Sequence, residues 1–128
     1  MKKLPRREFT KTYHIIFDVF GANTKMLDSE KFVFELLMEI PPLVDMKILS
    51  GPNVVRDYDD GHQGVSAFEI IDFSHISIHT FVDTKEAFVD IFSCRPYDYE
   101  KVRDYLYKKF KVSTKQVETL EVKYHFEK

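Results

Sequence analysis

The sequence predicts an α+β fold, an α/β sandwich in which an antiparallel sheet is covered by two helices on one face. Three observations support this prediction. Apolar residues recur at helical spacing in only two segments, and most other apolar residues fall in short strand-like runs. Neighbouring runs are joined by short turns, which favour antiparallel pairing. With 128 residues and no internal repeat, the chain is expected to be a single domain, residues 1–128.

The first strand and the first helix are distinguished by a change of period. Residues 13–20 are rich in β-branched and aromatic side chains and precede a glycine, which predicts a strand. In the segment LDSEKFVFELLMEIPP, residues 27–42, apolar side chains recur every three or four positions, as in an amphipathic helix. Asp28 or Ser29 can cap its start, and the pair Pro41-Pro42 is expected to end it.

The rest of the chain predicts five further strands and a second helix. The strands are expected at residues 44–49, 65–71, 74–81, 86–94 and 117–126. Residues 98–110 carry apolar side chains on one face, acidic residues early and lysines late, as the dipole of a helix favours. An SGPN turn is expected to close the strand at 44–49, and the polar segment 56–64 is expected to be a surface loop.

Charge and cysteine content exclude several classes of partner. With 19 Lys+Arg against 21 Asp+Glu, no global field attracts nucleic acid or anionic lipid, and no segment is apolar enough to span a membrane. The single cysteine, Cys94, has no partner for an intramolecular disulfide, so a cytoplasmic protein is expected.

His75 and His79 lie four residues apart on a strand, about 13 Å, which is too far for a shared metal ion. No metal site is expected.

The expected hairpins bring reactive side chains together. A turn centred on position 84 places Ser74 opposite Cys94, and a two-residue Asp-Phe turn places Ser66 opposite His79. Because side chains alternate along a regular strand, Ser74 and His79 would point to opposite faces, so we expect a kink beside Ser74. On these residues alone, Ser66 and His79 fit a simple hydrogen-bonded pair as well as a catalytic one. Cys94 equally fits a buried apolar side chain.

Residues 64–94, GVSAFEIIDFSHISIHTFVDTKEAFVDIFSC, resemble the core of the prokaryotic S-adenosylmethionine decarboxylases, in which an SHxxIHT strand is followed by a VDxFxC-like strand. The segment HIIFDVFGAN followed by LDS is similar to the first strand and helix entry of the same family. This resemblance implies an α/β sandwich protomer and a homodimer. It also implies pyruvoyl-dependent decarboxylation of S-adenosylmethionine, which supplies the aminopropyl donor for spermidine.

The resemblance assigns roles residue by residue. Ser74 matches the serine that attacks the carbonyl of the preceding residue, so the chain would be cut between Phe73 and Ser74, and Ser74 would become an N-terminal pyruvoyl cofactor. His79 matches the histidine that assists elimination, and Ser66 matches a serine that helps processing. Cys94 matches the general acid that protonates the α-carbon of the substrate after carbon dioxide leaves.

Two positions depart from the family pattern, and a third residue is a candidate for a family role by its place before GVS. Phe73 stands where the family usually has glutamate before the cleaved serine, and Asp83 stands where it has a substrate-binding glutamate. Tyr58 is the candidate for the aromatic residue that stacks on adenine. These departures leave two alternatives open, a pyruvoyl-dependent arginine or ornithine decarboxylase and an unprocessed, non-catalytic homologue.

Overall fold

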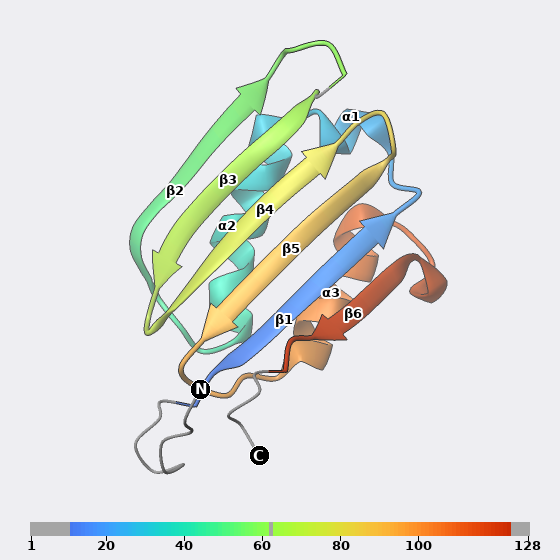
Figure 1. Cartoon of the computed structure of the whole chain (residues 1–128). Coiled ribbons are helices and arrows are strands. Elements are labelled where there is room, and N and C mark those ends of the chain that lie inside the picture. The colour runs from blue at the N-terminus through green and yellow to red at the C-terminus, as the bar shows by residue number, and fades with distance from the viewer. Residues whose placement is uncertain (1–10, 62, 124–128) are drawn as a thin grey trace, which may run out of the picture.

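The computed structural model describes residues 11–61 and 63–123, which form one antiparallel sheet with helices on one side of it (Figure 1). The sheet has six strands in the order β2-β3-β4-β5-β1-β6, and every neighbouring pair is antiparallel. Its strands are β1 (Tyr13–Phe20), β2 (Ile48–Asp57), β3 (Gly64–Ile71), β4 (Ser74–Phe81), β5 (Glu86–Ser93) and β6 (Val117–Glu121). The helices are α1 (Thr24–Leu27), α2 (Glu30–Leu43), α3 (Tyr99–Phe110) and a short 3₁₀ helix, η2 (Thr114–Gln116). The predicted fold class is confirmed.

The core lies between the sheet and the two long helices. Strand residues alternate between a helix-covered face and an open face, which on β4 carries His75, Ser77, His79 and Phe81. The covered face and the helices enclose a continuous apolar cluster whose largest members include Phe17, Leu36, Ile40, Ile76, Ile91, Leu106 and Phe110. None of the described helices is long and apolar enough to cross a membrane.

The segment around α2 differs from the prediction at two places. A short helix, α1, precedes α2 and starts at Asn23, whose side chain accepts the N–H of Lys25. Ser29 caps α2 as one of the two predicted alternatives, but Pro41 and Pro42 lie inside its last turn and do not end it. Each proline lacks the N–H that would bond to the carbonyl four residues earlier, and the helix ends one residue after the second proline.

Strand β2 is later and longer than the strand expected at 44–49. It begins at Ile48 and runs through the SGPN sequence to Asp57. Its pairing with β3 shifts register between Ser50 and Asn53, and Gly51 there has a φ of 99°. The glycine and proline therefore form an irregularity inside a strand rather than a turn after one. At the other end of the chain, β6 stops at Glu121, and residues 124–126 of the expected strand lie outside the described residues.

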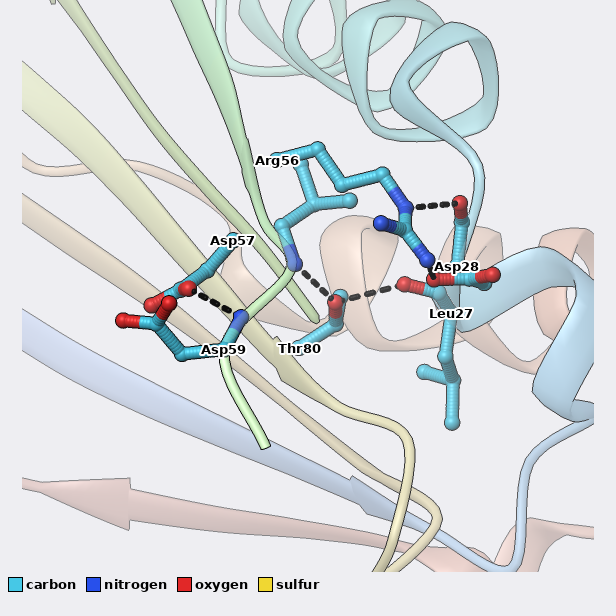
Figure 2. A network of polar contacts seen from close by, with 7 residues as sticks. Leu27, Asp28, Arg56, Asp57, Asp59 and Thr80 are labelled. Atoms are coloured by element: carbon cyan, nitrogen blue, oxygen red, sulfur yellow. Dashed lines mark hydrogen bonds and ion pairs between the residues drawn. The ribbon is translucent and has the colours of Figure 1, made fainter. Parts of the chain in front are cut away.

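Polar contacts connect α1 to the start of β3 and to the end of β4, which lie side by side (Figure 2). The Thr80 hydroxyl donates to the carbonyl of Leu27 at 2.6 Å and accepts the N–H of Val65 at 2.8 Å. Beside it, the guanidinium of Arg56 pairs with the carboxylate of Asp28. Because Thr80 is only 4% exposed, its hydroxyl satisfies two backbone groups from which water is excluded.

Replacing this hydroxyl tests how much the connection contributes. We expect Thr80→Val to lower the free energy of unfolding by about 1–3 kcal/mol, because it leaves a buried N–H and a buried carbonyl without partners. Urea unfolding measures the change. The matched control is Thr119→Val at an exposed position of β6. An equal effect of the two substitutions would contradict the proposed contribution of Thr80.

Candidate functional site

The connection between β3 and β4 is a two-residue turn, Asp72-Phe73, as the sequence predicts. The turn is held to the segment before β2, because the Asp72 carboxylate accepts the N–H of Lys47 at 2.9 Å and the Asp72 N–H donates to the Lys47 carbonyl at 3.1 Å. Phe73 has a φ of 52°, a left-handed conformation that is unfavourable for a residue with a Cβ atom. Backbone strain therefore lies directly before Ser74.

The carbonyl of Phe73 and the hydroxyl of Ser74 have distinct environments. The backbone N–H of Cys94 donates to the Phe73 carbonyl at 3.0 Å, so a fixed dipole points at the oxygen that would gain charge during attack. Ser74 is 8% exposed on the helix-covered face, and its hydroxyl donates to the sulfur of Met46 at 3.2 Å. A thioether is a weak acceptor, so this hydroxyl is held loosely.

The predicted register between β4 and β5 is wrong by one residue. Phe81 pairs with Glu86, so the connecting turn contains four residues, and Ser74 lies opposite Ser93 rather than Cys94. Cys94 follows the last residue of β5, where its side chain is exposed. The bond from its N–H to the Phe73 carbonyl continues the hydrogen bonding of the two strands one step beyond their ends.

The predicted pairing of Ser66 with His79 is confirmed. These residues are directly opposite on β3 and β4, and Ser66 Oγ lies 2.9 Å from His79 Nδ1. Both side chains are on the open face of the sheet. A shallow hollow of about 350 Å³ surrounds them and is lined by Asn53, Val55, Ser66, Phe68, Ser77 and His79.

The structure separates these two groups of predicted site residues within one chain. Strand β4 shows unbroken alternation, so the expected kink beside Ser74 is absent, and Ser74 and His79 point to opposite faces. Five residues of strand also put about 16 Å between them. Asp83 lies in the turn after β4, and Tyr58 follows β2, both at the end of the sheet away from Ser74 (Figure 1). Tyr58 is 70% exposed and packs against the guanidinium of Arg56.

The sequence prediction missed a row of side chains on the open face near the start of β4. His14 Nε2 lies 2.7 Å from Asp90 Oδ1, and the rings of His75 and Phe92 stack with centroids 5.3 Å apart. The signal was present in the alternation of β1 and β5, which places His14 and Asp90 on the same face. Within the described ranges, no group of three or more potential ligands is placed to hold a metal ion.

Glu69 is the other residue that the prediction missed. It occupies a covered-face position of β3 and is 1% exposed, and burial raises the pKa of its carboxyl to about 8. The signal was its place in the alternation, because Val65, Ala67 and Ile71 on the same face are all apolar.

Three comparisons show what this chain resembles. A family model described as S-adenosylmethionine decarboxylase matches residues 13–123. An S-adenosylmethionine decarboxylase proenzyme of Clostridium botulinum, strain Langeland, is 34% identical over 112 residues, which are 86% of this chain and 90% of that protein. A proenzyme of the same name from Thermoanaerobacter sp., strain X514, is 34% identical over 83 residues, 63% of this chain and 62% of that protein. The crystal structure of the adenosylmethionine decarboxylase from Aquifex aeolicus shares the fold, with a TM-score of 0.72 at 21% identity over 88% of this chain and 89% of that one.

The left-handed conformation of Phe73 predicts an unusual preference for glycine. In a Ser74→Ala background, we expect Phe73→Gly to be about 1 kcal/mol more stable than Phe73→Ala, because only glycine adopts a φ of 52° without strain. Urea unfolding of the two variants gives the difference, and the shared loss of the phenyl ring cancels. At Phe81, within β4, the same pair should show the opposite order, since glycine weakens a strand. A more stable alanine variant at position 73 would refute the strain.

Proposed function

The chain belongs to the S-adenosylmethionine decarboxylase family, and from this premise we propose that it decarboxylates S-adenosylmethionine with a pyruvoyl group formed from Ser74 by self-cleavage. The product would be the aminopropyl donor for spermidine synthesis. One observation carries the proposal: the buried hydroxyl of Ser74 directly follows a strained residue, Phe73, whose carbonyl already accepts the N–H of Cys94.

The residues around position 74 fit the formation of such a group. Attack of Ser74 Oγ on the Phe73 carbonyl breaks the peptide bond and leaves an ester, and the N–H of Cys94 stabilises the negative charge on the carbonyl oxygen. Breaking the turn also releases the strain at Phe73. When formed, the pyruvoyl group supplies an electron sink for decarboxylation, comparable to that of pyridoxal phosphate.

The other predicted residues act on protons and on the substrate. The exposed thiol of Cys94, next to the turn, would donate the proton that replaces the lost carboxylate, a contribution typically worth about 10²–10⁴-fold in rate. His79, hydrogen-bonded to Ser66, would assist the elimination that follows ester formation. Asp83 would bind the substrate, and Tyr58 would stack on its adenine.

We also propose that the active form is a homodimer that packs open face to open face. The open face exposes apolar side chains over four strands: Val55, Phe68, Ile70, Phe81 and Leu120. A patch of this kind on one side of a sheet is typical of an interface. A twofold axis that lies between the two sheets, parallel to their planes and perpendicular to the strands, would bring the start of β4 in one protomer over the end of β4 in its partner.

This arrangement resolves the separation of the two groups of residues. Ser74 and Cys94 of one protomer would form a complete site with the partner's Ser66 and His79, which within one chain lie too far away. Formation of the ester would release the nitrogen of residue 74 from the turn, so that this residue can leave the covered face before elimination. The cytoplasm suits this assembly because the thiol of Cys94 stays reduced there.

Intact mass and carbon dioxide release test the proposed activity. We expect two fragments that meet at positions 73 and 74, with the second blocked by a ketone, and release of labelled carbon dioxide from S-adenosylmethionine but not from arginine or ornithine. Ser74→Ala should remain one uncut chain. Cys94→Ala is the matched control, because it keeps the backbone N–H: it should be cut normally and turn over at least about 10²-fold more slowly. An uncut wild-type chain would favour the non-catalytic alternative, and release from arginine would favour the other decarboxylase.

Mixed dimers test whether the site is shared. We expect His79→Ala protein to be uncut alone and to be cut when refolded together with Ser74→Ala protein, because the latter supplies an intact His79 across the interface. The control mixes His79→Ala with the double variant Ser74→Ala/His79→Ala, which can supply none. If His79→Ala protein stays uncut in both mixtures, the shared site is wrong.

A further inference from the structure

Glu69 is the single ionisable side chain that is fully buried in the described part of the chain. It lies on the helix-covered face of β3, and neither of its carboxyl oxygens has a hydrogen-bond partner among the described residues. A buried carboxyl without a partner destabilises a fold, and an apolar side chain would suit this position better. A functional role would explain a carboxyl group at this position.

The register of β3 and β4 places Glu69 beside Ser74. Glu69 is opposite Ile76, and Ile71 is opposite Ser74, so Glu69 and Ser74 are diagonal neighbours on the same face. Such neighbours have Cβ atoms roughly 7 Å apart, within reach of a long side chain. The Ser74 hydroxyl now donates to a thioether, a weaker acceptor than a carboxylate.

Other acidic and basic groups near the turn are already engaged or point elsewhere. The carboxylate of Asp72 accepts the N–H of Lys47 and faces Arg95 at 4.0 Å. His79 and the neighbouring His75 are on the open face. Glu69 is thus the carboxyl that shares a buried face with the Ser74 hydroxyl.

The groups that surround Glu69 are uncharged on each element packed against it. Its own strand contributes Ala67 and Ile71, and β4 contributes Ser74, Ile76 and Ile78. Strand β2 approaches with Gly51, where an added Cβ would lie 3.2 Å from Glu69. The buried face of α2 is apolar. Of its acidic residues, Glu35 and Glu39 pair on the outside with Lys109, and Glu30 is exposed in the first turn.

We propose that Glu69 accepts the hydroxyl proton of Ser74 when the backbone breaks, and returns it to the departing nitrogen. This inference rests on the proposed self-cleavage. The Oγ–H proton moves to Glu69 as Oγ bonds to the Phe73 carbonyl carbon. The C–N bond then breaks, and the nitrogen of residue 74 takes the proton from Glu69. An ester and a free amine result, and Glu69 ends in the state in which it began.

The proposal fixes the dependence of cleavage on pH. Burial raises the pKa of Glu69 to about 8, so the fraction able to accept a proton increases up to that pH and then levels off. The cleavage rate should follow the same curve. The free energy of unfolding should change in the opposite direction to the cleavage rate. The folded protein holds the proton of Glu69 more tightly than the unfolded chain does, so this stabilisation is present at low pH and is lost as pH rises through about 8.

Cleavage of refolded precursor, followed by intact mass across a pH series, tests the proposal. We expect Glu69→Gln and Glu69→Leu to be cut at least about 10²-fold more slowly than wild type, although Glu69→Leu should be the more stable protein. Glu69→Asp should recover part of the rate. The control Ile76→Val alters packing opposite Glu69 and should be less stable but cut at the wild-type rate.

Hydroxylamine identifies the step, because it cleaves an ester and not a peptide bond. With hydroxylamine present, part of the wild type should be split at 73/74 with an unmodified serine at the new N-terminus instead of the ketone, and Glu69→Gln should give none of this fragment. If Glu69→Leu is cut at the wild-type rate with an unchanged pH profile, or if hydroxylamine splits Glu69→Gln as fast as wild type, the role of Glu69 is overturned and the proposed function stands. A wild-type chain that is never cut overturns the function and the role of Glu69 together.

Discussion

The two-residue connection between β3 and β4 is the constraint on which the rest of the arrangement depends. With only Asp72 and Phe73 between the strands, the register has no freedom: Ser66 must face His79, and Glu69 must share a face with Ser74. The connection forces Phe73 into a left-handed conformation, which costs about 1–2 kcal/mol. The two hydrogen bonds between Asp72 and Lys47 offset this cost and hold the strained bond in place.

Alternation along β4 then divides the chemistry between two environments. The hydroxyl of Ser74 begins in the core, where water is excluded, whereas Ser66 and His79 lie on the open face. Exclusion of water suits the first step, because an ester that forms in the core is protected from hydrolysis until elimination occurs. The open face suits the later steps, elimination and decarboxylation, because a partner protomer and a substrate can reach it. In the proposed mechanism, the backbone break moves residue 74 from one environment to the other.

The sequence predicted strand pairing correctly where a short turn determined the register. The Asp-Phe turn between two alternating runs allowed a single register, and the Ser66–His79 contact was therefore predicted correctly. The next turn is longer, with four residues and a positive φ of 60° at Lys85, and its length did not follow from its residues. The register of β5 was consequently displaced by one residue. Gly51-Pro52 resembled a turn because a bulge inside a strand uses the same residues. The contribution that we propose for a partner protomer lies beyond any single-chain pattern.

The position of the proposed proton acceptor explains how cleavage can wait for folding. A carboxyl at position 73, where the family usually has glutamate, would be largely exposed, as Phe73 is at 70%, and would titrate near its ordinary pKa in folded and unfolded chains alike. Glu69 has a raised pKa only because the core closes over it, so its affinity for a proton arises with the native packing. The strain at Phe73 and the N–H of Cys94 are also properties of the folded state. All three proposed contributions to breaking the chain are therefore absent until the sheet and its helices have assembled, which would protect the unfolded polypeptide from cutting itself.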